Sequence, residues 1–535
     1  MSSNNSKTLF QALWNSADIL RSKMDASEYK NYLLGLVFYK YLSDRMLCFA
    51  VDMLEEKAET IQDAQKIYEL AYYDLDTQKD LIDVLKEEFS YALEPNLTFT
   101  ALVQKAHDMT FELEDLAQGF RNIEQSSELF ENLFEDVDLY SKKLGQNASK
   151  QSKTITAVMK ELDTLDLAHD GDALGDAYEY LIGQFASDSG KKAGEFYTPQ
   201  PISTLMSRIV LEGMKDKKGF SVYDPTMGSG SLLLNVKKYS NEPGTINYFG
   251  QELNTSTFNL ARMNMILHGV DIANQHLKNG DTLDADWPVD EPTNFDAVLM
   301  NPPYSAKWGA EKGFLDDPRY SSYGVLAPKS KADFAFLLHG YYHLKESGTM
   351  AIVLPHGVLF RGAAEGKIRK ILLDNGAIDT VIGLPANIFF NTSIPTTVII
   401  LKKNRRNKDV LFIDASQDFT KSKNQNKLEK QHIDKIVETY LERESIEKYA
   451  HVADFEEIIE NDYNLNIPRY VDTFEEEEPI SLVDVAKELS QVQKEIKEAN
   501  TKLAEMFEDL TATDPDVQVE LNQFLEILKS GDIHG

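Results

Sequence analysis

The sequence predicts a protein of the mixed α/β class, with a helical N-terminal domain, a doubly wound and mainly parallel sheet, and C-terminal helices of coiled-coil type. Three observations predict this order. The first 165 residues show helical periodicity with almost no strand signal. From Ser221 onward, short β-branched runs alternate with helical stretches, which is typical of a parallel sheet. Beyond residue 480, apolar residues recur three and four positions apart.

Length and composition limit the kinds of protein to consider. At 535 residues the chain is long enough for two to four domains, since a domain usually takes about 100 to 200 residues. We expect domains at residues 1–165, 166–475 and 476–535. The single cysteine, Cys48, leaves no disulfide framework and no thiolate zinc site, and the ten histidines show no metal-ligand spacing. No metal site is therefore expected.

The start of the chain does not resemble a targeting segment. Residues 1–7 lead into amphipathic sequence, whereas a signal peptide has a uniformly apolar stretch. The apolar run at residues 32–42 is short and is followed by Asp44 and Arg45, so it is interpreted as a buried helix and not as a membrane span. We therefore expect a cytoplasmic protein without membrane contact.

The charge balance argues against a chain that binds nucleic acid by itself. The 87 acidic and 55 basic residues give a net charge of −32 and a pI near 4.7, whereas binding to phosphates needs Lys and Arg. Many acidic proteins have no such role. A local exception is the group Lys307, Trp308, Lys312, Arg319, Tyr320, Lys329 and Lys331. This segment either orders over DNA or is a solvated loop.

The predicted strands give the order of the sheet along the chain. They lie at residues 221–224, 246–252, 277–281, 295–300, 349–354, 379–384, 396–401 and 410–413. Residues 402–409 are too few for a helical crossover between the last two strands, so at least one antiparallel pairing is expected. The charged segment 415–480 is interpreted as helical cover and linker.

The tetrapeptide Asn301-Pro302-Pro303-Tyr304 follows the predicted strand 295–300, at the strand end where open α/β sheets bind ligands. The Asn301 side chain and the Pro302 backbone each offer a carbonyl acceptor, which suits a planar NH2 group. The Tyr304 ring could stack on the base or amide that carries this group. Asn-Pro and Pro-Pro also occur in ordinary turns, so the tetrapeptide alone leaves both interpretations open.

Three further strand ends carry residues suited to a nucleoside-type cofactor. Residues 224–231 form a glycine-rich turn in which Gly228 and Gly230 allow close ligand approach, although the full G-x-G-x-x-G spacing is missing. Glu252 follows about 20 residues later, where an acid binds ribose hydroxyls. Asp281 ends the next strand and could reach an adenine amino group. Single acids at strand ends are usually only solvated, so the ordered series carries the prediction.

The C-terminal tail shows a heptad seam. Its apolar residues are Leu482, Val485, Leu489, Val492, Ile496, Ala499, Leu503, Met506 and Leu510. Pro515 ends the pattern, and Val517, Leu521, Phe524 and Leu528 outline a shorter amphipathic helix. A long helix folded back on its own core would also fit, but a strict 3,4 spacing favours pairing with another long helix.

These motifs together resemble the S-adenosylmethionine-dependent DNA amino-methyltransferases, and among them the modification subunit of type I restriction-modification systems. The resemblance also includes residues 194–200, similar to the first cofactor-contact segment of the family, residues 464–470 near the end of the core, and the helical leader from residue 13 to 44. Tyr304 departs from the Phe that many type I subunits carry. Both rings can stack, so the base-pocket interpretation is unaffected.

The resemblance implies a Rossmann-like class I methyltransferase that moves the methyl group of S-adenosylmethionine directly to N6 of an adenine flipped out of double-stranded DNA. It implies these catalytic residues: Asn301, Pro302, Pro303 and Tyr304. It implies a cofactor site formed by Glu195, Phe196, Tyr197, Thr198, Pro199, Gln200, Asp224, Pro225, Gly228, Ser229, Gly230, Ser231, Glu252 and Asp281. No covalent nucleophile is expected, since Cys48 lies far from every motif in the sequence.

The resemblance also implies partners. A separate specificity subunit would define the DNA site and receive the C-terminal tail, with two modification subunits on each specificity subunit, and a restriction subunit would complete the complex. The net negative charge agrees with this division, because it suggests that another chain supplies most of the DNA contacts. Little sequence remains after residue 304 for a recognition domain of its own.

Three alternatives remain at this stage. An N4-cytosine DNA methyltransferase would use the same fold, although Ser is commoner than Asn at the head of its motif. A protein-glutamine N5-methyltransferase also uses an Asn-Pro-Pro-Tyr pocket, but it would not need a large helical leader or a heptad tail. A non-catalytic assembly subunit would not need the cofactor motifs that this chain carries.

Overall fold

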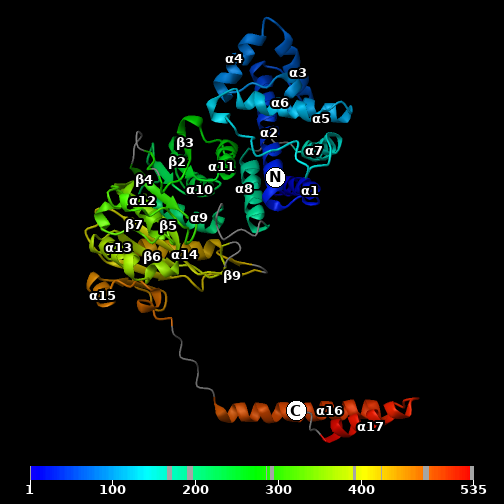
Figure 1. Ribbon diagram of the computed structural model, residues 1–535, viewed down its shortest axis with the longest axis vertical. Helices are drawn as coiled ribbons and strands as arrows, with labels where there is room; N and C mark the ends of the chain where they lie inside the picture. Colours follow the sequence, from blue (N-terminus) through cyan, green and yellow to red (C-terminus); the bar gives the residue numbers. More distant parts are fainter. Residues whose placement is uncertain are drawn as a thin grey trace. The chain divides into compact units, whose positions relative to one another are not determined.

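The computed structural model describes residues 2–165, 171–188, 197–284, 286–288, 294–389, 393–422, 425–473 and 481–530. The chain divides into two compact units, Met1–Asp472 and Thr473–Gly535 (Figure 1). The first unit contains a helical part and the sheet, and the second contains the tail helices. The helical part and the sheet are described together below, and the tail helices by themselves.

The helical part confirms the helices expected for the start of the chain. They are α1 Ser2–Arg21, α2 Ala26–Met53, α3 Ile61–Tyr73, α4 Gln78–Phe89, α5 Phe99–His107, α6 Leu113–Glu124 and α7 Ala148–Leu162. Helix α2 is apolar around much of its circumference and runs through the middle of this core, so most of its side chains after Tyr29 are buried. No strand precedes Ser221 in the described residues.

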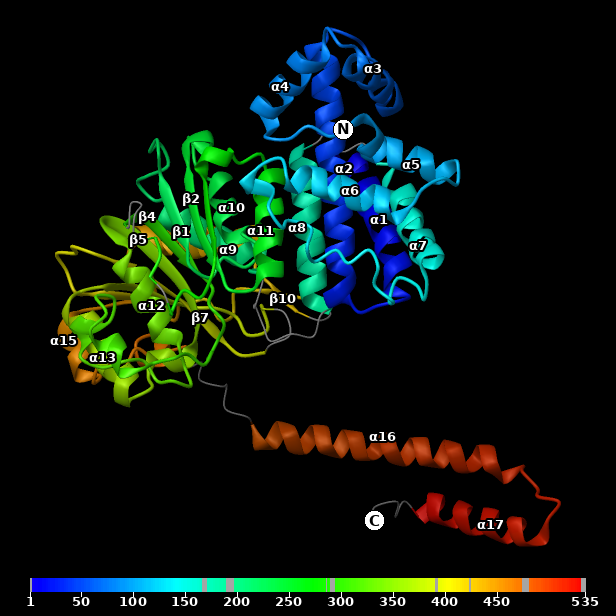
Figure 2. The ribbon, with the colours of Figure 1, turned by 45° about the horizontal axis from the view of Figure 1, so that its top comes forward.

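Two helices join the helical part to the sheet. Helix α8 Gly171–Asp188 packs on α2, and α11 Thr255–Leu267 contacts both α8 and α2. Figure 2 shows α8 and α11 between the helical part and the strands. Because Leu260, Met263 and Ile266 of α11 belong to the helical core, the two parts share apolar surface. The helical leader is therefore held against the sheet by its own packing.

The sheet has nine strands in the described residues. They are β1 Ser221–Asp224, β2 Asn247–Glu252, β3 Gln275–Asn279, β4 Phe295–Met300, β5 Leu344–Pro355, β6 Ile378–Gly383, β7 Thr396–Lys402, β8 Val410–Asp414 and β11 Ala450–Ala453. Their spatial order is β11-β8-β6-β7-β5-β4-β1-β2-β3. In the part β5-β4-β1-β2-β3, each pair of adjacent strands is parallel, which confirms the prediction of a mainly parallel sheet.

The expected antiparallel pairing is present, but its partners differ from the two strands that suggested it. Strand β7 runs antiparallel to both β5 and β6, whereas β8 is parallel to β6. Strands β7 and β8 thus run in opposite directions with β6 between them. The short segment between them therefore leads past β6 without a helical crossover.

Segment 415–480 was only partly predicted. It contains helices α14 Lys430–Glu442 and α15 Phe455–Glu460, but also strand β11, which is antiparallel to β8, and a small hairpin of β9 Thr420–Lys421 and β10 Asn426–Lys427. The interpretation as helical cover and linker was therefore wrong for β11. In the stretch 464–470, the Tyr470 ring stacks on Phe412 of β8 at 3.9 Å.

Helices cover both faces of the sheet, and the central strands are buried on both sides. Ala297 and Leu299 of β4 face a core with α9 Gln200–Val210, α10 Ser231–Lys237 and α14. Val298 and Met300 face the opposite core, with α12 Asp333–Tyr342 and α13 Ala363–Asp374. This alternation follows from the period of two in a strand. Double burial explains why β4 is apolar at every position except Asp296.

The topology creates a crevice at β1 and β4. From β1 the chain builds β2 and β3 on one side, then returns to place β4 and β5 on the other side of β1. Such a reversal leaves an opening outside the carboxyl ends of the strands, and ligands of open α/β sheets bind there. The glycine turn, Glu252 and Asn301 all follow strands that end at this edge.

The C-terminal unit is a pair of helices, α16 Leu482–Glu508 and α17 Pro515–Ser530, as the heptad and amphipathic patterns predict. Phe507 contacts Phe524 with ring centroids 5.8 Å apart, so α17 folds back on the end of α16 (Figure 2). Much of the seam stays exposed, including Leu482, Val485, Leu489, Val492, Ile496, Leu503 and Met506. None of the described helices is long and apolar enough to cross a membrane.

A buried ion pair within α2 yields the first testable prediction. Lys40 Nζ lies 2.6 Å from Asp44 Oδ2, and both side chains are almost completely buried. Lys40→Met would leave the carboxylate without its cation in the core, so we expect a loss of about 3–5 kcal/mol in unfolding free energy, measured by urea denaturation. The double variant Lys40→Met/Asp44→Leu should recover most of it.

The matched control is Lys66→Met in the exposed pair Lys66–Asp63, which should leave the urea midpoint nearly unchanged because solvent screens that pair. Equal effects of the Lys40 and Lys66 substitutions would contradict the prediction.

Candidate active site

The glycine turn after β1 adopts backbone conformations that favour glycine. Gly228 and Gly230 have φ values of 55° and 79°, in the left-handed region. A Cβ atom on Gly230 would also lie only 3.2 Å from Met265 Cε of α11. Ser231 begins α10, and its hydroxyl lies 2.9 Å from the hydroxyl of Ser229. The turn thus presents backbone, with little side-chain bulk, to the crevice.

Glu252 closes the turn from the neighbouring strand. Its Oε2 accepts from the Gly228 backbone N–H at 3.1 Å, and its Oε1 accepts from the Asn254 N–H at 2.8 Å. Burial raises the pKa of Glu252, although these backbone hydrogen bonds act in the opposite direction. The structure therefore brings together the glycine turn and the acid that the sequence separates by about 20 residues.

Asp224 ends β1 and is almost fully buried beneath the turn. Its Oδ1 accepts from the backbone N–H of Thr226 at 2.9 Å. Burial raises the pKa of Asp224 to about 8, even though the hydrogen bonds from Thr226 lower it. In the absence of a ligand, this carboxyl is therefore largely protonated at neutral pH. A cation bound nearby would favour its ionised form.

Asp281 follows β3 and is exposed at the same edge of the sheet. Its Oδ1 accepts from the Leu283 N–H at 2.9 Å. The next residue, Thr282, donates its hydroxyl to the Pro225 carbonyl oxygen at 2.5 Å, which ties the end of β3 to the glycine turn. The three predicted strand-end acids are Asp224, Glu252 and Asp281. They lie in the same region because Glu252 accepts from Gly228 of the turn and Thr282, next to Asp281, donates to Pro225, next to Asp224.

Asn301 is held by hydrogen bonds at both ends of its amide. Its Nδ2 donates to Thr198 Oγ1 at 3.2 Å, and its Oδ1 accepts from the Tyr304 hydroxyl at 3.0 Å. Asn301 is 6% exposed, and Pro302 is buried beside it. The Tyr304 ring meets Phe389 edge-on at 6.1 Å. Thr198 connects the Asn-Pro-Pro-Tyr tetrapeptide to the predicted cofactor segment, although it lies 103 positions before Asn301 in the sequence.

The remaining described residues of the cofactor segment rest on α8. The Tyr197 ring packs over Gly183, where a Cβ atom would come within 3.2 Å of it. Pro199 precedes α9, and the Gln200 side chain donates to Glu179 Oε2. Glu195 and Phe196, which the sequence analysis also placed in this site, lie outside the described residues.

Glu179 was missed by the sequence analysis. It is 4% exposed, and burial raises its pKa to about 7. Nothing in the sequence pattern around it distinguishes this acid from a solvated one. Asn264 of α11 donates to the Ser229 carbonyl oxygen at 3.0 Å, so α8 and α11 support the site from the same side. Helices α8 and α11 therefore contact both predicted cofactor segments.

The basic segment after Tyr304 is not uniformly exposed. Arg319 is 2% exposed, pairs with Asp317 at 2.7 Å and donates to the Thr282 carbonyl oxygen at 2.9 Å. Tyr320 is buried against Trp308. Neither interpretation of the segment, as a DNA-ordering or a solvated loop, therefore applies to Arg319 and Tyr320. Lys307, Lys312 and Lys329 are exposed.

The fold brings together two groups of acids and histidines that the sequence spacing does not reveal. In the group Asp286, His339 and His343, both ring nitrogens of His339 have partners, Tyr223 at 2.9 Å and Arg319 at 3.1 Å. In the group Asp176, Glu179 and His268, the Lys238 ammonium lies 2.9 Å from Asp176. Its charge disfavours a second cation there. We assign neither group to a metal.

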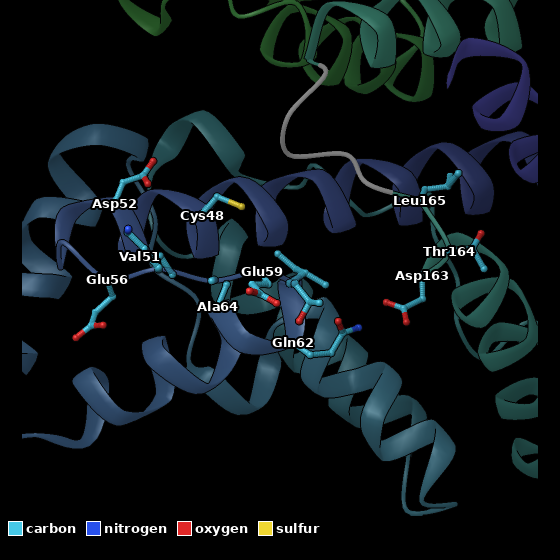
Figure 3. Close-up of a pocket in the computed structure, with 14 residues that line it drawn as sticks. Cys48, Val51, Asp52, Glu56, Glu59, Gln62, Ala64, Asp163, Thr164 and Leu165 are labelled. Atoms are coloured by element: carbon cyan, nitrogen blue, oxygen red, sulfur yellow. The ribbon is translucent and has the colours of Figure 1, made fainter. Parts of the chain in front are cut away.

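A pocket of about 620 Å³ lies in the helical part, between the ends of α2 and α7 and the start of α3 (Figure 3). Its acidic side chains are Asp52, Glu56, Glu59 and Asp163, and Cys48 lies among its apolar ones. None of the residues that the sequence analysis placed in the active site lines it. The candidate active site is therefore the crevice at β1 and β4.

Three features meet at adjacent strand ends: a glycine turn, an acid placed to bind ribose hydroxyls, and an Asn-Pro-Pro-Tyr tetrapeptide. This combination defines the class of S-adenosylmethionine-dependent amino-methyltransferases. Comparison with known families agrees. Residues 169–479 match the N-6 DNA Methylase family, and residues 9–162 match the HsdM N-terminal domain. The chain belongs to the N-6 DNA methylase family, and within it to the type I restriction enzyme methylase subunits.

Individual relatives cover nearly the whole chain. The crystal structure of a type I restriction-modification system methyltransferase subunit from Streptococcus thermophilus is 70% identical, covers 88% of this chain and all of that one, and has a TM-score of 0.87. The MpnII methylase subunit of Mycoplasma pneumoniae is 35% identical over 93% of this chain and 95% of its own. The MjaVII methylase subunit of Methanocaldococcus jannaschii is 33% identical over 90% and 81%.

The raised pKa of Asp224 predicts proton release on cofactor binding. S-adenosylmethionine carries a positive sulfonium, so its binding beside Asp224 should lower a pKa that is about 8 in the empty site. Affinity should then rise with pH between 6 and 8, by up to about tenfold per unit, because bound cofactor requires the ionised carboxyl. Calorimetry in buffers of different ionisation enthalpy measures the released protons.

Asp224→Asn should remove this proton release, since the amide does not titrate. Binding of the cofactor to the unsubstituted chain at pH 7 without proton release would contradict the prediction.

Proposed function

We propose that this chain is the modification subunit of a type I restriction-modification complex, and that it transfers a methyl group from S-adenosylmethionine to N6 of adenine in DNA. The observation that carries the proposal is the position of Asn301. Its side chain lies at the end of β4, beside the strand β1 that leads into the glycine turn. Its Nδ2 donates to Thr198 Oγ1 of the predicted cofactor segment at 3.2 Å. An acceptor for an amino group thus adjoins a nucleoside site.

The tetrapeptide supplies two carbonyl acceptors, and its two prolines add no backbone donor. Asn301 Oδ1 and the Pro302 carbonyl oxygen would accept the two N6 hydrogens, while neither proline has a backbone N–H of its own. The lone pair of N6 is delocalised into the adenine ring, so it is a poor nucleophile. Accepting both hydrogens returns electron density to the nitrogen, and fixed acceptors need no rearrangement during the reaction. The cofactor, when bound, supplies an electrophilic methyl group.

We assign the cofactor site to residues at the ends of β1, β2 and β3 and in the segment before α9. Glu252 would accept from the ribose hydroxyls and Asp281 from the adenine amino group. The backbone at Gly228–Ser231 would contact the methionine part, next to Asp224 and Pro225. Thr198 and Gln200 would position this part through their links to Asn301 and Glu179. Glu195, Phe196, Tyr197 and Pro199 complete the assignment.

The target base must leave the double helix to reach Asn301, which costs a few kcal/mol. The Tyr304 ring would offset part of this cost by stacking on the flipped adenine. The family to which the chain belongs, N-6 DNA methylases, supports adenine over N4 of cytosine or a protein glutamine as the acceptor. The nearly complete set of cofactor motifs supports a catalytic subunit over a silent assembly subunit.

We assign DNA recognition to a separate specificity subunit. The net charge of −32 disfavours extensive contact of this chain with phosphates. The exposed seam of α16 offers apolar residues at heptad spacing to long helices of that subunit. We propose two modification subunits on each specificity subunit, a restriction subunit in the full complex, and a cytoplasmic location where the modification protects host DNA from cleavage.

The domain organisation that we propose follows this division of labour. Residues 1–165 form the helical domain, 166–475 the catalytic domain, and 476–535 the tail that docks on the specificity subunit. The separate compact unit Thr473–Gly535 supports the last boundary. Within Met1–Asp472, shared packing of α8 and α11 couples the first two domains closely.

Asn301→Ala tests the catalytic assignment. We expect methyl transfer to fall by about 10²–10³-fold or more, because a preorganised acceptor for the reacting amino group is lost. Cofactor affinity should stay close to that of the unsubstituted chain. Tritiated methyl transfer to unmodified DNA, with the specificity subunit present, measures the first quantity, and calorimetry measures the second.

The matched control is Asn274→Ala, a partly exposed Asn before β3, at the opposite edge of the sheet from Asn301. It should retain transfer. Loss of cofactor binding in Asn301→Ala would sink this assignment of roles, and a product other than N6-methyladenine on nucleoside analysis would overturn the proposed function.

Leu489→Asp and Ile496→Asp test the docking of the tail. A charge buried in an apolar helix interface is strongly unfavourable, so each substitution should abolish co-purification with the specificity subunit. Gln491→Asp, on α16 but outside the seam, adds the same charge and should not. Cofactor binding by the chain alone should be unchanged in all three variants. Complex formation by both seam variants would show that the specificity subunit binds elsewhere.

A further inference from the structure

We infer that the Tyr304 hydroxyl is a placeholder: it occupies Asn301 Oδ1 while the base pocket is empty and competes with the target amino group for that acceptor. This inference rests on the proposed function, in which Asn301 Oδ1 accepts from N6 of the flipped adenine. It concerns a different property, namely the state of the pocket before the base enters. The hydroxyl and the amino group are both donors, and they claim the same oxygen.

The contacts of Asn301 support this competition. The Tyr304 hydroxyl donates to Oδ1 at 3.0 Å, while Nδ2 faces Thr198 Oγ1 at 3.2 Å. Because Asn301 is 6% exposed, an unfilled Oδ1 would be a buried acceptor without a donor. Burial also raises the pKa of Tyr304 far above its usual value, so its hydroxyl remains a donor over the whole range of physiological pH.

The backbone after Tyr304 is anchored, so the hydroxyl can leave only by side-chain rotation. The Ser305 backbone N–H donates to Asp333 Oδ1 at 2.8 Å, and Asp333 Oδ2 is paired with Arg361 at 2.9 Å. Asp333 is itself completely buried at the start of α12. The anchored backbone keeps the ring near the pocket, where it can stack on the base after the hydroxyl has released Oδ1.

The alternative is that the hydroxyl stays on Oδ1 during the reaction and orients Asn301. An oxygen that accepts a hydrogen bond from Tyr304 at the same time would be a weaker acceptor for the base. The two possibilities predict opposite effects of removing the hydroxyl. If it is a placeholder, Tyr304→Phe increases the preference for a base with an amino group. If it orients Asn301, the same substitution reduces that preference.

The experiment measures this preference directly. The complex of this chain with its specificity subunit, in the presence of S-adenosylhomocysteine, is titrated with duplexes that carry either adenine or purine at the target position. Purine lacks the 6-amino group. The ratio of the two dissociation constants reports the contribution of that group. In Tyr304→Phe the preference for adenine should increase by about 2- to 10-fold, which corresponds to one net hydrogen bond.

Two controls make the outcome decisive. Tyr342→Phe, which removes a hydroxyl on partly exposed α12, should leave the ratio unchanged. Unchanged affinity of Tyr304→Phe for the cofactor shows that the variant is folded. A ratio in Tyr304→Phe that is equal to or smaller than that of the unsubstituted complex overturns the placeholder. If the unsubstituted complex yields no N6-methyladenine when S-adenosylmethionine replaces S-adenosylhomocysteine, the proposed function itself is overturned.

Discussion

The buried carboxylate of Asp296 fixes the register of the three central strands, and the active site depends on that register. Its Oδ2 accepts from the backbone N–H of Ser221 at 3.0 Å, at the start of β1, and its Oδ1 lies 2.6 Å from Lys217 and 3.1 Å from Lys345 of β5. Burial alone would raise the pKa of Asp296, but these hydrogen bonds hold it below the usual value. A shift by one residue would break them all, and it would turn every side chain of β4 to the opposite face.

The same register positions the candidate site residues at the carboxyl ends of the strands. Because β1 and β4 are parallel neighbours from Val222 and Ala297 onward, Asp224 and Asn301 emerge at one edge. Two helices support this edge from outside: Glu179 of α8 holds Gln200, and Asn264 of α11 holds Ser229. Because α8 and α11 also pack in the core of the N-terminal helices, that core helps to set where the predicted cofactor segments lie.

The sequence was informative about the position of candidate site residues that come directly after a strand along the chain. The residues Asp224, Glu252 and Asn301 each come directly after a short apolar run, so the local pattern places them at strand ends. It could not reveal Glu179 or the link from Thr198 to Asn301, because those contacts join distant segments. Strand β11 was missed because Ala450–Ala453 contains one β-branched residue and is only four residues long. Arg319 was expected on the surface because unpaired arginine is rarely buried, but Asp317 neutralises it.

The net charge of the chain bears on how it meets DNA, whereas the hydrogen bonds of the proposed pocket bear on how the site is held in place. A chain with a net charge of −32 gains little from phosphates, which supports the proposal that a partner supplies most of the DNA contacts. The pocket, in contrast, has its polar groups already paired: Asn301 is held by Thr198 and Tyr304, and Glu252 by the glycine turn. Hydrogen bonds of this kind stabilise buried polar groups, because a buried donor or acceptor without a partner costs free energy. The described part of the proposed site is therefore held together by contacts within this chain.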